Sequence, residues 1–95
     1  MQRASAWEAE LNKERAGALG TTAGKLERLL EELKALSAKI DQAERGDLRD
    51  LWLADYRRLR EESEKQRWNL CVQREAMGLR RHDDVERYYP TAPRR

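Results

Sequence analysis

The sequence predicts an all-α protein: an antiparallel helical hairpin, coiled-coil-like, with a short N-terminal helix or kinked helical extension and a short C-terminal helix and tail. Apolar residues recur at alternating spacings of three and four, the heptad pattern of a helix that buries one narrow stripe. The first run contains Leu26, Leu29, Leu33, Leu36, Ile40 and Ala43. The second run, after a short polar turn, contains Trp52, Tyr56, Leu59, Ser63, Gln66, Leu70, Gln73 and Met77.

The length of 95 residues suits one domain. We expect this domain to span residues 1–89 and an extended basic tail to follow at 90–95. Its helices are expected at about residues 4–19, 23–44, 48–77 and 84–89. Because charged residues make up 40% of the chain, a lone hairpin has little apolar surface to bury, and association with another chain would stabilise it.

Glycines at positions 17, 20 and 24 separate the first two helical stretches. Glycine is costly inside a helix, so the chain is expected to break or kink here, with Thr21 or Thr22 capping the next helix. The alternative is one continuous helix in which the glycines form a smooth stripe that another helix approaches closely. Both alternatives stay open at this point.

The turn of the hairpin is expected at Gly46, which suits the end of one helix, with Asp47 as the N-cap of the next. Gly78 is the expected end of the long second arm. A tight turn near residue 46 also sets the register. It places Ile40 opposite Trp52, Leu36 opposite Tyr56, Leu33 opposite Leu59, and Leu26 near Gln66.

Apolar residues also gather at the end of the hairpin away from the turn. We expect them to form a second cluster, in which the C-terminal segment packs, as far as Tyr88, against the start of the first helical stretch. The members are Trp7, Leu11, Met77, Leu79, Val85 and Tyr88.

Residues with catalytic or metal-binding chemistry are few, so we expect no enzyme, no metal site and no cofactor. Cys71 is the one cysteine and His82 the one histidine of the chain. His82, Asp83 and Asp84 are consecutive and do not share a helical face. Cys71 is expected to be a small buried residue. No apolar stretch is long enough to span a membrane, so we expect a cytoplasmic protein without membrane insertion.

A second apolar stripe on the long arm is the predicted partner-binding surface. It consists of Leu53, Trp68, Val72, Ala76 and Leu79. One partner helix cannot cover both this stripe and the heptad seam. We therefore expect a non-enzymatic protein–protein interaction or assembly module, with a homodimer favoured over a complex with another protein.

The C-terminal end carries the excess of positive charge and supports an alternative function. Its candidate residues are Arg80, Arg81, Pro90, Pro93, Arg94 and Arg95. An arginine-rich end suits a small nucleic-acid-associated protein, although a protein partner is the first expectation. Arg57, Arg58 and Arg60 lie beside glutamates and are expected to form a mixed solvated face.

Residues 90–93, Pro-Thr-Ala-Pro, resemble the late-domain motif that a UEV domain of the ESCRT-I complex binds. The resemblance implies that this extended, preorganised segment is a peptide ligand. The other interpretation is an ordinary tail bounded by prolines.

Overall fold

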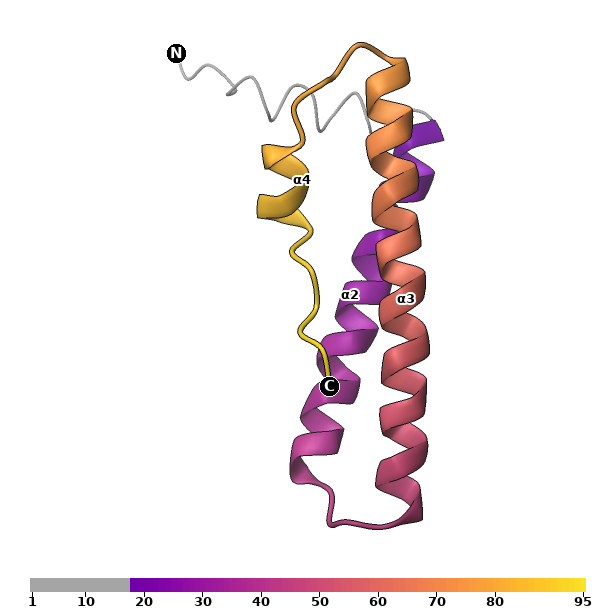
Figure 1. Cartoon of the computed structure of the whole chain (residues 1–95), viewed down its shortest axis with the longest axis vertical. Helices are drawn as coiled ribbons and strands as arrows, with labels where there is room; N and C mark the ends of the chain where they lie inside the picture. The colour runs from indigo at the N-terminus through magenta and orange to yellow at the C-terminus, as the bar shows by residue number, and fades with distance from the viewer. Residues whose placement is uncertain (1–17) are drawn as a thin grey trace.

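The computed structural model describes residues 18–95 and contains three helices and no strand within that range. The helices are α2 (Ala18–Gln42), α3 (Asp47–Ala76) and α4 (Asp83–Tyr88). Helices α2 and α3 run antiparallel and pack side by side, while α4 and the segment after it lie against the hairpin (Figure 1). The predicted all-α hairpin is confirmed.

Helix α2 passes through Gly20 and Gly24 without interruption. The break expected at residues 20–22 is therefore wrong, and Gly17 lies outside the described residues, as does most of the helix expected at 4–19. Packing offsets the cost of the glycines, because Thr22 and Ala23 are both buried. A Cβ added at Gly24 would meet nothing within 4 Å, so no described helix approaches closely there.

The turn between α2 and α3 occupies residues 43–46, so α2 ends two residues earlier than expected. Gly46, and not Asp47, is the N-cap of α3, and its carbonyl oxygen accepts the first helical hydrogen bond from the Asp50 amide at 3.0 Å. The Arg49 Nε donates to the carbonyl oxygen of Ile40 at 3.4 Å. This contact supplies a partner to one of the last carbonyls of α2.

Helix α3 ends at Ala76, and Gly78, the terminator that the sequence indicates, follows its C-cap Met77. Gly78 has a φ of 87°, a left-handed conformation that glycine adopts without a steric penalty. The Leu79 amide donates to the carbonyl of Arg74, and the Gly78 amide donates to that of Glu75, each at 2.9 Å. These two bonds form a Schellman motif, which closes the helix and turns the chain back toward α4.

The core consists of two clusters along the hairpin. The turn-side cluster contains Leu33, Ile40, Tyr56 and Ala92, with Leu30, Leu36, Trp52, Leu53 and Leu59 packed against it. The far cluster contains Ala23, Leu26, Leu70, Val85 and Tyr89, with Leu30 and Cys71 packed against it. Ser63 is fully buried in α3, and its hydroxyl donates to the carbonyl of Arg60 at 2.7 Å.

The far cluster is present, but its membership differs from the expectation. Tyr89, and not Tyr88, is buried, while Met77 is 56% exposed. Trp7 and Leu11 lie outside the described residues. Val85 and Tyr89, the C-cap of α4, are one helical turn apart and therefore lie on the same side, and the Tyr89 amide donates to the carbonyl of Val85 at 2.9 Å.

Residues 89–95, which we call the strap, run back along the hairpin toward the turn (Figure 1). Residues 90–95 of the strap form no helix or strand, and Ala92 among them is buried in the turn-side cluster. The strap therefore belongs to the folded domain. In the part of the chain that the structure describes, no helix is long and apolar enough to cross a membrane.

Candidate interaction surfaces

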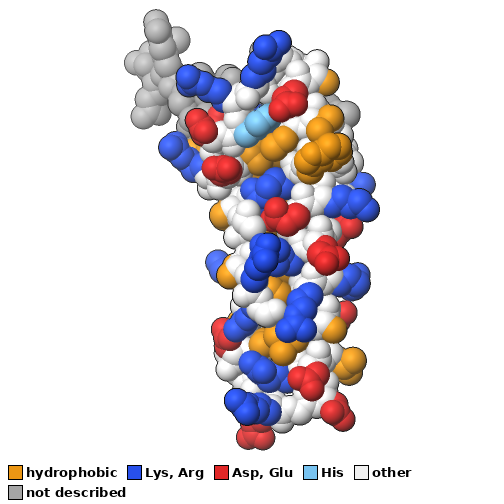
Figure 2. All heavy atoms as spheres, viewed as in Figure 1, with side chains coloured by type: hydrophobic (Ala, Val, Ile, Leu, Met, Phe, Trp, Pro, Cys, Tyr) orange, Lys and Arg blue, Asp and Glu red, His pale blue; other side chains and the backbone are white. Residues whose placement is uncertain are grey.

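The outer face of α3 carries an exposed apolar patch, consisting of Trp68, Val72 and Ala76. Trp68 is 67% exposed and Val72 is 42% exposed. Ala76 is exposed as well, and the spacing of four residues places all three on one side of the helix. Figure 2 shows hydrophobic side chains gathered over the C-terminal half of α3. Lys65 and Glu75, both exposed, lie on the same side of the helix, Lys65 one turn before Trp68 and Glu75 beside Ala76, where its carboxylate also contacts His82 at 2.7 Å.

The structure does not bring all five predicted stripe residues together. Leu53 is half-buried and packs against the turn-side cluster. Leu79 lies beyond the end of α3 and is half-buried. The surface that stays open therefore consists of the central three residues, which we call the α3 patch.

Side chains of α3 hold the backbone of the strap. The Tyr56 hydroxyl donates to the carbonyl oxygen of Pro93 at 2.6 Å, and the Arg60 Nε donates to that of Ala92 at 2.9 Å. The Arg57 Nε donates to the carbonyl oxygen of Arg95 at 2.8 Å. An extended segment cannot bond its own carbonyls as a helix does, so side-chain donors replace those bonds.

Arg95 anchors the end of the strap to α2. Its guanidinium donates to both the carbonyl oxygen and the hydroxyl of Ser37, at 2.9 and 2.6 Å, and forms an ion pair with Asp41. The same guanidinium lies over the Tyr56 ring, 5.9 Å from its centroid. These contacts make Arg95 a bridge between the two helices of the hairpin.

The other C-terminal residues singled out from the sequence are placed differently. Arg80, Arg81, Pro90, Pro93 and Arg94 are exposed. The backbone carbonyl of Arg81 accepts a hydrogen bond from the buried Arg74 at 3.2 Å. The motif-like residues 90–93 thus lie docked on the hairpin through Ala92.

Sequence reasoning missed the role of Arg57 and Arg60, which were expected on a solvated face. Arg57 and Arg58 are exposed, as expected, and Arg58 pairs with Asp55 at 3.5 Å, but Arg57 and Arg60 also hold the strap. The sequence contains only a weak indication that these two arginines bind the strap. Arg57 and Arg60 are spaced for one helical face, and the proline-bounded strap needs donors for its carbonyls.

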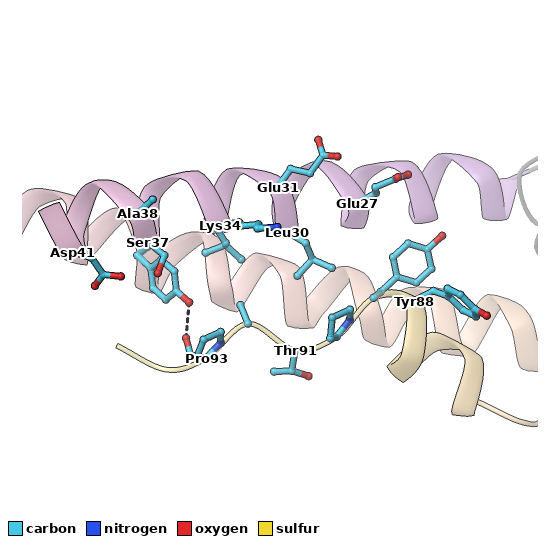
Figure 3. Close-up of a pocket in the computed structure, with 15 residues that line it drawn as sticks. Glu27, Leu30, Glu31, Lys34, Ser37, Ala38, Asp41, Tyr88, Thr91 and Pro93 are labelled. Carbon is cyan, nitrogen blue, oxygen red and sulfur yellow. Dashed lines mark hydrogen bonds between the residues drawn. The ribbon is translucent and has the colours of Figure 1, made fainter.

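A groove of about 580 Å³ separates α2 from the strap. Figure 3 shows Leu30 pointing from α2 toward the strap, with Tyr88, Thr91 and Pro93 on the opposite side. Leu33 and Tyr56 also line it. The volume is typical of pockets that bind small molecules or peptide side chains.

The thiol and imidazole of the chain lie near the end of α3. Burial raises the pKa of the Cys71 thiol; Arg67 opposes this effect, while Glu75 and Glu86 add to it. The Nε2 atom of His82 lies 2.7 Å from Oε1 of Glu75. Among residues 18–95, no three His, Cys, Asp or Glu side chains are placed to hold a metal ion.

Comparison with known proteins gave no relatives: no family model, no curated protein and no solved structure matches this chain.

Proposed function

We propose that this protein is a non-enzymatic interaction and assembly module that pairs with a second copy of itself through the α3 patch. The exposure of Trp68 is the observation that supports this most strongly. Trp68 is 67% exposed and lies beside Val72 on a helix that is otherwise strongly polar. Tryptophan is enriched at the centres of protein interfaces, where burying its ring contributes much of the affinity.

The pattern around the patch favours a second copy as the partner. If two α3 helices cross antiparallel about a twofold axis near residue 70, Trp68 of each faces Val72 of the other. The same arrangement places Lys65 of each copy opposite Glu75 of the other, so opposite charges meet on both sides of the apolar contact. Such a surface is complementary to itself, which a twofold interface requires.

Sedimentation equilibrium tests this proposal. The wild-type protein is expected at twice its monomer mass of 11.2 kDa, and Trp68→Glu/Val72→Glu at the monomer mass. Leu48→Glu/Leu51→Glu is the matched control, since both leucines are exposed near the other end of α3. A wild-type monomer at high micromolar concentration would contradict the proposal, as would an equal effect of the control pair.

The alternative, a nucleic-acid-associated protein that uses its arginine-rich end, receives less support. Arg57, Arg60 and Arg95 all take part in holding the strap, which leaves them less available to phosphates. Glu61 and Glu64 lie among these arginines around one shallow surface pocket. Binding of a DNA or RNA probe that weakens steeply with salt would favour the alternative.

The cytoplasm remains the proposed location for the module.

A further inference from the structure

The groove between α2 and the strap concentrates aromatic rings. The chain contains three tyrosines, and Tyr56, Tyr88 and Tyr89 all line this groove. Pro90, Pro93 and Leu30 add apolar surface to its walls. Tyrosine faces attract cations as well as apolar groups, because the π-electron cloud carries partial negative charge.

The charged residues of the groove are mainly acidic. Glu27, Glu31 and Asp41 line it on the α2 side, Lys34 is the opposing charge among the lining residues, and Asp41 is already paired with Arg95. Glu27 and Glu31 are one helical turn apart and exposed, and Figure 3 shows the Glu31 carboxylate on the side of α2 that faces away from the strap, so these two residues form the outer rim of the groove. The chain as a whole has a formal net charge of +2. The groove is therefore an aromatic surface in which carboxylates outnumber the one lysine, even after Asp41 is paired with Arg95.

One end of this groove already holds a cationic side chain. Arg95 pairs with Asp41, donates to Ser37 and lies over the Tyr56 ring. Here a carboxylate, a hydroxyl and an aromatic face together bind a guanidinium. Toward the other end, Tyr88 and Tyr89 provide rings inside the groove, and Glu27 and Glu31 provide carboxylates at its outer rim on α2.

From these features we propose that the groove binds a peptide segment of a partner protein that carries arginine or lysine next to leucine-like side chains. The apolar side chains of the segment enter between Leu30 and Pro90, and its cationic groups extend over α2 to Glu27 and Glu31 at the outer rim. The pocket and the self-pairing surface are different, because the α3 patch shares no residue with the groove. The two proposals therefore succeed or fail separately.

An NMR titration of the isotope-labelled full chain tests the site. The probe is an acetylated, amidated pentapeptide in which two arginines alternate with three leucines. The matched control peptide has neutral citrulline in place of each arginine. The arginine probe is expected to shift the amide signals of Leu30, Tyr88 and Thr91, and the citrulline peptide is expected to bind more weakly.

Variants of α2 test whether the carboxylates of Glu27 and Glu31 contribute to binding of the arginine probe. Glu27→Gln/Glu31→Gln is expected to raise the Kd of the arginine probe about five- to tenfold, because each carboxylate contributes a screened Coulomb attraction. Glu32→Gln is the matched control, since Glu32 is exposed on the same helix and does not line the groove. Its Kd is expected to equal that of the wild type.

Three outcomes would overturn the proposal. One is the absence of shifts at the groove at millimolar probe, and another is equal binding of the two peptides. The third is evidence that another segment of protein already occupies the groove before the probe is added. Groove shifts that depend on protein concentration would assign it to a second copy, and contacts from residues 1–17 to Leu30 would assign it to this chain.

Discussion

The hydroxyl of Tyr56 donates a 2.6 Å hydrogen bond to the backbone carbonyl of Pro93, and this contact joins the middle of α3 to the strap. Tyr56 is only 1% exposed, so its hydroxyl has little access to water and depends on this acceptor. A buried phenol without a partner would destabilise the fold. The strap therefore completes the core of the hairpin.

Replacing Tyr56 by phenylalanine keeps the ring and removes the hydroxyl. We expect Tyr56→Phe to lower the free energy of unfolding by about 0.5–1.5 kcal/mol, the usual range for one hydrogen bond. Urea denaturation monitored by circular dichroism measures this change. Arg58→Ala, on the exposed face, is the control and should cost less than about 0.5 kcal/mol. The contact is unimportant if the two variants unfold at the same urea concentration.

A charged side chain at the buried position of the strap should weaken the packing of the strap against the hairpin. Ala92 is buried in the turn-side cluster, whereas its neighbour Thr91 is exposed. Ala92→Glu is expected to lower stability by about 1–3 kcal/mol, because it buries a carboxylate or displaces the strap. Thr91→Glu should be nearly neutral. Equal melting temperatures for the two variants would show that the strap does not pack as described.

The central leucine of α2 tests the hairpin seam. Leu33 is 1% exposed, so Leu33→Ala should leave a cavity and cost about 2–5 kcal/mol. Leu48 is 59% exposed, and Leu48→Ala should cost less than about 0.5 kcal/mol. Thermal melts compare the two. The seam is misassigned if Leu48→Ala is the more damaging change.

The Cys71 thiol should react slowly with alkylating reagents. Burial raises its pKa, so at mildly alkaline pH the folded protein holds less reactive thiolate than the unfolded chain. The pH profile of iodoacetamide reaction is expected to have its midpoint above that of the protein in urea. The same shift implies that stability falls as the pH rises from the ordinary thiol pKa through the raised one. An iodoacetamide midpoint in the folded protein below that of the unfolded chain would contradict the raised pKa of Cys71.

The heptad spacing was sufficient to predict the hairpin, and the reason is geometric. Leu26, Leu33 and Ile40 recur every seven residues and are all fully buried or nearly so. Gly78 ends α3 because its left-handed φ is a local property of glycine. Local signals of this kind can be read without knowing the tertiary structure.

The strap could not be predicted in the same way, since its contacts join residues far apart in the sequence. Arg60 is hydrogen-bonded to Ala92, and Arg95 is hydrogen-bonded to Ser37, and the periodicity of the sequence predicts neither contact. The glycine break at residues 20–22 was wrong for a related reason. Tertiary packing of Thr22 and Ala23 outweighed the weak helix propensity of the neighbouring glycines.

Charge reversal across the proposed twofold contact tests the central claim most directly. Sedimentation equilibrium would compare Lys65→Glu, Glu75→Lys and the double variant Lys65→Glu/Glu75→Lys. Each single reversal places like charges together twice in the dimer and is expected to raise the dimer Kd by about fivefold or more. The double variant is expected to return to the wild-type Kd, because opposite charges face each other again. A double variant that dissociates as readily as the single variants would contradict the antiparallel pairing of α3.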